Sequence, residues 1–141
     1  MYVGPIYSED DVEEVYPWCI DNGKAASKWS ACFNDVYNVP DGVPKHVIDI
    51  IGRKTPGYES WQGNRWLFSE HDALVFVAEV HGKKLLSEGD EAKINACRSA
   101  LSELNFPSDF DLSEVVIGGQ PAIYLFHDRA TGAYEAYADM T

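Results

Sequence analysis

The strongest hydrophobic pattern along the chain predicts a helix from Ser87 to Leu104. Apolar side chains recur there at every third or fourth position, so they share one face of a helix. The residues on this face are Ile94, Cys97, Leu101 and Leu104. Ser87 and Asp90 are expected to cap the first turn, and Pro107 predicts that the helix ends shortly before it. We therefore expect Cys97 to face the core.

Two shorter helices are predicted nearer the N-terminus. The first covers residues 24–33, where Ala26, Trp29 and Phe33 keep helical spacing. The second has Pro44 at its first position and stops near Gly52, since proline suits the start of a helix. Its buried face is expected to contain Val47, Ile48, Ile50 and Ile51.

Strands are predicted where β-branched and aromatic residues are concentrated. The ranges are 2–7, 65–69, 73–80, 122–126 and 134–138. Because residues 74–80 are almost all apolar, we expect the third strand to be buried on both faces. A helix over residues 72–80 is the alternative, since a short apolar run does not distinguish a strand from a helix. The last two strands are expected to form a hairpin around a polar turn at 128–132.

This mixture of helical and antiparallel strand signals predicts the fold class. We expect an α+β protein in which a mostly antiparallel sheet packs with two or three helices. The chain has 141 residues, of which 45% are hydrophobic, and it is long enough to form its own core. We therefore expect a single domain over residues 1–141.

Tyr58, Trp61 and Trp66 form an aromatic group around a turn predicted at 62–64. Tyrosine and tryptophan are common anchors at protein interfaces, so the group could be an exposed binding surface. It could equally be the aromatic layer of a small core, and we prefer this structural interpretation.

The net charge narrows the classes of partner. Eleven Lys and Arg residues stand against 23 Asp and Glu residues, which gives a formal charge of −12 and an isoelectric point near 4.5. Such a field repels nucleic acid and anionic membranes, and it accelerates association with basic proteins. We therefore expect neither nucleic acid nor a membrane as a partner. Solubility is the other explanation of the acidity.

The acidic residues gather in two short segments. The first follows Ser8, and its members are Glu9, Asp10, Asp11, Glu13 and Glu14. If this run is helical, Val12 and Val15 share one face and the carboxylates lie favourably near the helix N-terminus. The second segment surrounds the aromatic residue Phe110, and its acidic members are Asp109, Asp111 and Glu114. The first segment is either a binding surface for a basic ligand or a solvated helix face.

Candidate catalytic residues are few. The dipeptides His71–Asp72 and His127–Asp128 suggest a metal phosphohydrolase, but the second dipeptide falls at a predicted hairpin turn, where ligands would not project inward from a helix. The sequence contains no phosphate-binding loop, dinucleotide fingerprint or nucleophile elbow. We therefore expect no catalytic residues and a protein that is not an enzyme.

The cysteines give neither a disulfide framework nor a metal site. Cys19, Cys32 and Cys97 are odd in number and widely spaced. Residues 16–29 resemble a zinc knuckle in which Tyr16 occupies the position of the first cysteine of a C-x-x-C pair. A lone thiolate cannot hold structural zinc, so we expect no metal and no cofactor. No leader or membrane-spanning run is recognisable, and we expect a cytoplasmic protein with reduced thiols.

The same segment, which begins YPWCIDNGKAASK, carries a family resemblance. It resembles the pattern C-P-W-C-I-x-D-G-x-A-A-x-K of the CbrC family, small bacterial proteins associated with colicin tolerance. The similarity extends to residues 2–8 and 53–62, to parts of 66–76 and to parts of 122–139, whereas residues 81–115 do not match. Where family members carry cysteine, this chain has Tyr16, Glu70, Leu74, Asp128 and Thr131. The resemblance implies a metal-free relative that lacks the N-terminal zinc knuckle and nearly all family cysteines.

The resemblance and the acidity together predict an immunity protein. We expect it to neutralise a basic nuclease-type toxin domain of a contact-dependent growth inhibition or bacteriocin system, by blocking the active site or access to substrate. The expected toxin-binding residues are Glu9, Asp10, Asp11, Glu13, Glu14, Asp109, Phe110 and Asp111. We expect a monomer or a weak dimer. The alternative is a metal-free CbrC-like stress or housekeeping protein of unknown action.

Overall fold

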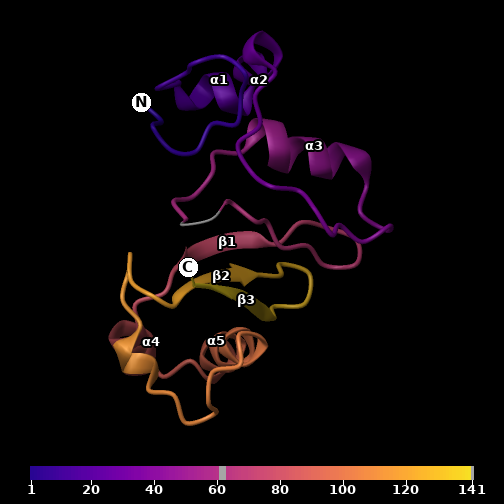
Figure 1. Cartoon of the computed structure of the whole chain (residues 1–141). Coiled ribbons are helices and arrows are strands. Elements are labelled where there is room, and N and C mark those ends of the chain that lie inside the picture. Colours follow the sequence, from indigo (N-terminus) through magenta and orange to yellow (C-terminus); the bar gives the residue numbers. More distant parts are fainter. Residues whose placement is uncertain (61–62, 141) are drawn as a thin grey trace. The chain divides into compact units, whose positions relative to one another are not determined.

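The computed structural model of the chain describes residues 1–60 and 63–140. The chain forms two compact units, Met1–Ala73 and Leu74–Thr141 (Figure 1). Trp61 and Gln62, predicted to belong to an aromatic group and to a turn, lie outside the described residues. That residues 1–141 form one domain stays a prediction.

The first unit contains three helices and a small core. The helices are α1 (Pro17–Asp21), α2 (Lys24–Trp29) and α3 (Lys45–Lys54). α1 begins with a proline, whose fixed φ suits the first helical position. Gly23 has a φ of 77°, and this left-handed step separates α1 from α2. The buried core residues are Val15, Ile20, Ala25, Ala31 and Phe33.

α2 and α3 differ at their ends from the predicted helices. α2 ends at Trp29 rather than four residues later, because Ser30 adopts a left-handed conformation with a φ of 48°. Pro44 is the N-cap of α3 rather than its first residue, and the helix continues to Lys54. Ile50 is exposed whereas Ile51 is buried, so the predicted buried face of this helix is only partly correct.

The strand predicted at the N-terminus is wrong, and the helix considered for the acidic run after it does not form. Residues 2–7 do not form a strand, and they make two isolated bridges, Tyr2 with Val15 and Tyr7 with Cys32. Pro5 lies within this segment and has no amide hydrogen to donate to a ladder. Residues 8–14 are not helical. The chain therefore runs through this region as a loop that contacts distant residues.

The second unit contains an antiparallel sheet and two α-helices. In chain order its elements are β1 (Val75–Glu79), α4 (Gly82–Glu88), α5 (Glu91–Glu103), the 3-10 helix η1 (Leu112–Glu114), β2 (Ala122–His127) and β3 (Tyr134–Asp139). The strands lie in the order β1-β2-β3 (Figure 1). The predicted α+β class is confirmed, with five α-helices among the described residues rather than the two or three predicted.

The sheet confirms the predicted hairpin and corrects the prediction for β1. β2 and β3 pair antiparallel, from Ala122 opposite Asp139 to His127 opposite Tyr134. Residues 75–79 form a strand, which excludes the helical alternative, but β1 lies at the edge of the sheet. Its two outward valines, Val75 and Val77, are exposed, so burial on both faces was a wrong prediction. The predicted strand at 65–69 does not form either.

The predicted helix over residues 87–104 is two helices, α4 and α5. Gly89, with a φ of 66°, ends α4 in a left-handed conformation. The Asp90 side chain then accepts hydrogen bonds from two backbone amides of the first turn of α5. Ser87 takes no part in this cap, because its hydroxyl donates to the Lys84 carbonyl at 2.8 Å.

α5 packs on the sheet through the face that contains Cys97. Cys97 and Leu101 share a buried cluster with Ile123 and Leu125 of β2, so the prediction that Cys97 faces the core is confirmed. Figure 1 shows α4 and α5 on the same side of the sheet. Within the described residues, no helix is both long enough and apolar enough to cross a bilayer.

Candidate functional site

The first acidic segment lies on a loop of residues 8–15, called here the acidic loop, whose two ends are tied down. At one end, Tyr2 and Val15 exchange two backbone hydrogen bonds, with N···O distances of 2.7 and 2.9 Å. At the other end, the Ser8 hydroxyl donates to the Trp29 carbonyl at 2.7 Å and accepts from the Asp10 amide at 3.1 Å. The loop is thus fixed by contacts with residues that are distant in the sequence.

The middle of the acidic loop is anchored by Val12, which packs against the core of the first unit. The five carboxylate residues around it are exposed: Glu9, Asp10, Asp11, Glu13 and Glu14. In the described part of the chain, the salt bridges lie elsewhere, and none involves these five residues. The loop therefore presents five carboxylates that none of the described residues neutralises through an ion pair.

An exposed aromatic pair, Tyr16 and Trp18, directly follows the acidic loop. The two rings are stacked, with 4.4 Å between their centroids and an angle of 15° between their planes. Tyr16 is 49% exposed and Trp18 is 61% exposed. The sequence reasoning missed this pair, since it treated Tyr16 as the replacement of a zinc ligand. The available signal was the Y-P-W order, in which Pro17 starts a short helix that keeps the two rings together.

The aromatic group predicted around residues 58–66 is structural where it is described. Tyr58 is 8% exposed and Trp66 is 6% exposed, and their ring centroids lie 6.1 Å apart. The Tyr58 hydroxyl donates to the Arg65 carbonyl. These contacts confirm the preferred core interpretation for both residues.

The residues considered for metal binding do not form a cluster. Cys19 is half-buried and packs against the core of the first unit. Within residues 1–60 and 63–140, no group of three or more His, Cys, Asp or Glu side chains could hold a metal ion. The His127 ring instead contacts the Tyr134 ring, with 4.8 Å between the centroids and 39° between the planes. That the protein needs no metal or cofactor stays a prediction.

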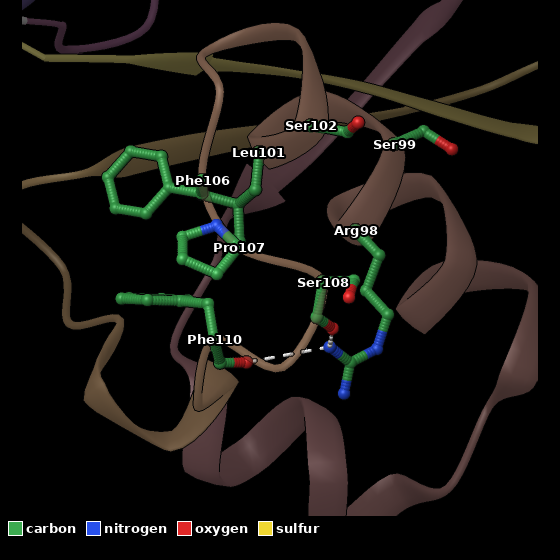
Figure 2. A pocket seen from close by; sticks show the side chains of 8 residues that line it. All are labelled: Arg98, Ser99, Leu101, Ser102, Phe106, Pro107, Ser108 and Phe110. Carbon is green, nitrogen blue, oxygen red and sulfur yellow. Dashed lines mark hydrogen bonds between the residues drawn. The ribbon is translucent and has the colours of Figure 1, made fainter.

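The second acidic segment lies in the second unit, in the loop between α5 and η1 and at the end of η1. It borders a pocket of about 290 Å³, lined by Arg98, Ser99, Leu101, Ser102, Phe106, Pro107, Ser108 and Phe110. Figure 2 shows the rings of Phe106, Pro107 and Phe110 together on one side and the Arg98 side chain on the other. The two phenyl rings meet edge to face at 4.9 Å, and Phe110 is half-buried against the core.

Arg98 and Asp111 have structural tasks in this loop. The Arg98 guanidinium donates to the carbonyls of Ser108 and Phe110, at 3.3 and 3.5 Å (Figure 2). The Asp111 carboxylate caps η1 by accepting from the Ser113 amide at 2.9 Å. This hydrogen bond is the main reason that the pKa of Asp111 lies below its ordinary value. Asp109 is exposed and free to face a partner.

Two further pockets in the first unit share Asp49 and Arg53 in their walls. One of about 320 Å³ also contains Lys54, and the other, of about 310 Å³, also contains Cys32. Asp49 and Arg53 pair with each other at 3.6 Å, and the Arg53 guanidinium also contacts the Ala26 carbonyl at 3.4 Å. Asp49 and Arg53 are thus already engaged by groups of the chain itself.

Comparison with known proteins places the chain in a family. The family model described as "Uncharacterised protein family (UPF0167)" matches residues 1–140. UPF0167 protein Mb2317 of Mycobacterium bovis is 33% identical over 144 residues, which cover 98% of this chain and 75% of that protein. UPF0167 protein PA1536 of Pseudomonas aeruginosa is 31% identical over 132 residues, which cover 89% of this chain and 72% of that protein. No solved structure gives a significant match.

These matches correct the family expected from the sequence. The model that covers nearly the whole chain is that of UPF0167, the relatives at 31% and 33% identity bear the same name, and nothing in them indicates the CbrC family. The expected CbrC family, drawn from the pattern around Cys19 and from the further matching segments, is therefore wrong. The chain belongs to the UPF0167 family.

Proposed function

We propose that this chain is an immunity protein that binds and neutralises a basic, nuclease-type toxin domain in the cytoplasm. The observation that carries the proposal is the acidic loop, where five exposed carboxylates lie on a backbone fixed at both ends. The proposal rests on this geometry and on the net charge, and it draws nothing from the corrected family resemblance.

The charge of the loop selects the class of partner. A domain that acts on nucleic acid must carry Lys and Arg residues, because phosphate contacts supply much of its affinity. A row of exposed carboxylates can occupy those same cations and so block access of the nucleic acid. The net charge of −12 adds long-range attraction, which raises the association rate.

The fixed ends of the loop favour tight binding. A flexible loop would lose conformational entropy when a partner orders it, and this loss would weaken the complex. Here the Tyr2–Val15 bridge and the Ser8 hydrogen bonds already hold the backbone. We propose a complex in which one chain, as a monomer or weak dimer, covers the active site or the route of the substrate to it.

Co-expression tests the proposal. The chain is produced together with the toxin-like domain encoded beside its gene, growth is recorded, and the pair is isolated by pull-down and studied by calorimetry. We expect growth to be rescued and binding in the nanomolar range. A toxic domain that still arrests growth, or that does not bind the purified chain, would contradict the proposal.

A variant that tests the acidic loop in this experiment carries both Glu13→Lys and Glu14→Lys. Both residues are exposed on the acidic loop, so the variant keeps the core intact while it reverses two charges. We expect weaker rescue at equal expression.

A further inference from the structure

The aromatic rings of the chain differ in whether a cation covers them. Lys28 lies 4.6 Å from the ring centroid of Trp29, Arg65 lies 5.7 Å from that of Tyr37, and Lys93 lies 5.4 Å from that of Tyr134. In the described residues, no cation of the chain lies over Tyr16 or Trp18, although these two rings are among its most exposed aromatic groups.

We propose that the Tyr16–Trp18 pair binds an arginine side chain of the basic partner, with the guanidinium lying on the open face of the Trp18 indole. The inference rests on the proposed function, because the arginine belongs to that partner. It adds an anchor of defined chemistry to a surface that otherwise attracts cations only by charge.

The stacking geometry leaves one face of the indole available. Tyr16 lies parallel to Trp18 at 4.4 Å and so covers one face of its ring system. An exposed fraction of 61% for Trp18 means that the opposite face is open to solvent. A cation within about 6 Å of an aromatic centroid is attracted by the ring, most strongly by that of tryptophan.

Glu14 supplies a carboxylate on the same side of the backbone. Val15 makes the antiparallel bridge with Tyr2, and its side chain is 3% exposed, so it points into the core. In extended backbone, successive side chains alternate between opposite sides. Glu14 and Tyr16 therefore both point to solvent, and both are exposed. This carboxylate and the Tyr16 ring thus leave the backbone on the same side.

Arginine satisfies this combination better than lysine does. Its planar guanidinium can stack on an indole while its edge donates hydrogen bonds to a carboxylate. The lysine ammonium is a compact and strongly hydrated charge that gains less from stacking. Tryptophan, tyrosine and arginine are also the residues most enriched among those that dominate interface energies.

The test uses two capped peptides, one of alternating glycine and arginine and one of alternating glycine and lysine. Each is titrated at low salt into the intact, ¹⁵N-labelled chain. The indole N–H signal of Trp18 and the backbone amide signals of residues 9–16 are followed by NMR, so that binding can also be measured where the indole is absent. The spectrum of Trp18→Ala identifies this signal by its absence. Tyr37→Ala serves as the matched control, because Tyr37 is also exposed but its ring already carries Arg65.

We expect the arginine peptide to shift the Trp18 signal in a saturable manner and to bind about two- to five-fold more tightly than the lysine peptide. Trp18→Ala should abolish this preference, and Tyr37→Ala should preserve it. Equal binding of the two peptides, or an arginine preference that survives Trp18→Ala, would overturn the inference.

The failure of this inference is distinguishable from failure of the proposed function. If the two peptides bind with equal affinity and Glu14→Gln weakens the binding of both, the arginine anchor is refuted. Electrostatic attraction of a basic partner by the acidic loop is then still supported. If the chain binds the arginine peptide more tightly than the lysine peptide, as expected, but co-expression does not restore growth, the anchor is supported and the immunity function is refuted.

Discussion

Asp90 determines where α5 begins. Its carboxylate accepts hydrogen bonds from the amides of Ala92 and Lys93, at 3.1 and 3.3 Å, and these amides have no partner within the helix. Ser87 lies three residues earlier and bonds within the last turn of α4 instead. Two polar residues that look equivalent in the sequence therefore have different roles.

This difference gives a prediction for stability. We expect Asp90→Ala to lower the free energy of unfolding by about 1 kcal/mol, the usual loss for a helix cap. Ser87→Ala is the matched control, and it should change the free energy by less than about 0.5 kcal/mol, as exposed substitutions usually do. Urea unfolding followed by circular dichroism measures both variants. Equal losses would mean that Ser87 shares the cap.

Asp111 gives a prediction for acid conditions. Its hydrogen bond from Ser113 holds its pKa below the ordinary value of 3.8, so the folded state favours the ionised carboxylate. A lowered native pKa stabilises the fold above the ordinary pKa, and this contribution is lost as the pH falls through the native pKa.

Asp111→Asn should therefore be less stable than the wild type near neutral pH, with a difference that shrinks as the pH falls below 3.8. Urea midpoints measured at a series of pH values test this expectation. Asp109→Asn is the control, because Asp109 is exposed in the same loop and caps no helix. A difference that grows towards acid pH would contradict the assignment.

Cys97 should be the least reactive of the three thiols. It is fully buried, and burial raises its pKa to about 11, whereas Cys19 and Cys32 are only half-buried. The reactive form of a thiol is the thiolate, which is therefore scarce at Cys97. We expect a thiol reagent to modify two cysteines in the folded chain and the third only in denaturant. Equal rates for all three would contradict the packing of α5.

At the scale of elements, the parts that follow local patterns could be predicted from the sequence. The hairpin of β2 and β3 has apolar strands close together in the chain and a polar turn between them. The N-terminal segment could not be predicted in this way, because Tyr2 bonds to Val15 and Tyr7 to Cys32 across longer separations. The edge position of β1 depends on strand order, which a local pattern does not contain.

The candidate site was likewise predictable only in part. The five carboxylates of the first acidic segment stand out by composition, and the structure places them together on one exposed loop. The Y-P-W order indicates that the two rings lie together, but it does not show that Trp18 is exposed, because a five-residue helix is too short for a hydrophobic period to separate its two faces. Phe110 and Asp111 were expected to bind a partner, yet one packs on Phe106 and the other caps η1. Their binding role stays a prediction.

The acidic loop gives a prediction at the same scale. Ser8 holds the loop through its bonds to Trp29 and Asp10, and it is partly buried. We expect Ser8→Ala to lower the free energy of unfolding by about 1 kcal/mol and to accelerate hydrogen exchange at the Asp10 amide. Unchanged exchange at that amide would show that the loop is held by the Tyr2–Val15 bridge without help from Ser8.

At the scale of the whole molecule, the excess of 23 acidic over 11 basic residues favours a basic partner. Such a charge acts over roughly 8 Å at physiological salt, so it affects the rate of encounter more than the contacts of the final complex. Local charge matters in addition to the total, because a partner that docks on the acidic loop experiences the nearest carboxylates most strongly. Total charge and local charge can therefore be separated by experiment.

The rate of association between the chain and the toxin-like domain encoded beside its gene tests the central claim most directly. Stopped-flow traces over a range of salt concentrations compare two double variants. The loop variant carries both Glu13→Lys and Glu14→Lys. The control carries both Glu103→Lys and Glu135→Lys, which change the net charge by the same amount at exposed sites of the second unit. We expect the loop variant to associate about ten-fold more slowly at low salt, with a weaker salt dependence, and the control to change much less. Equal rates for the two variants would show that the acidic loop is not the binding surface.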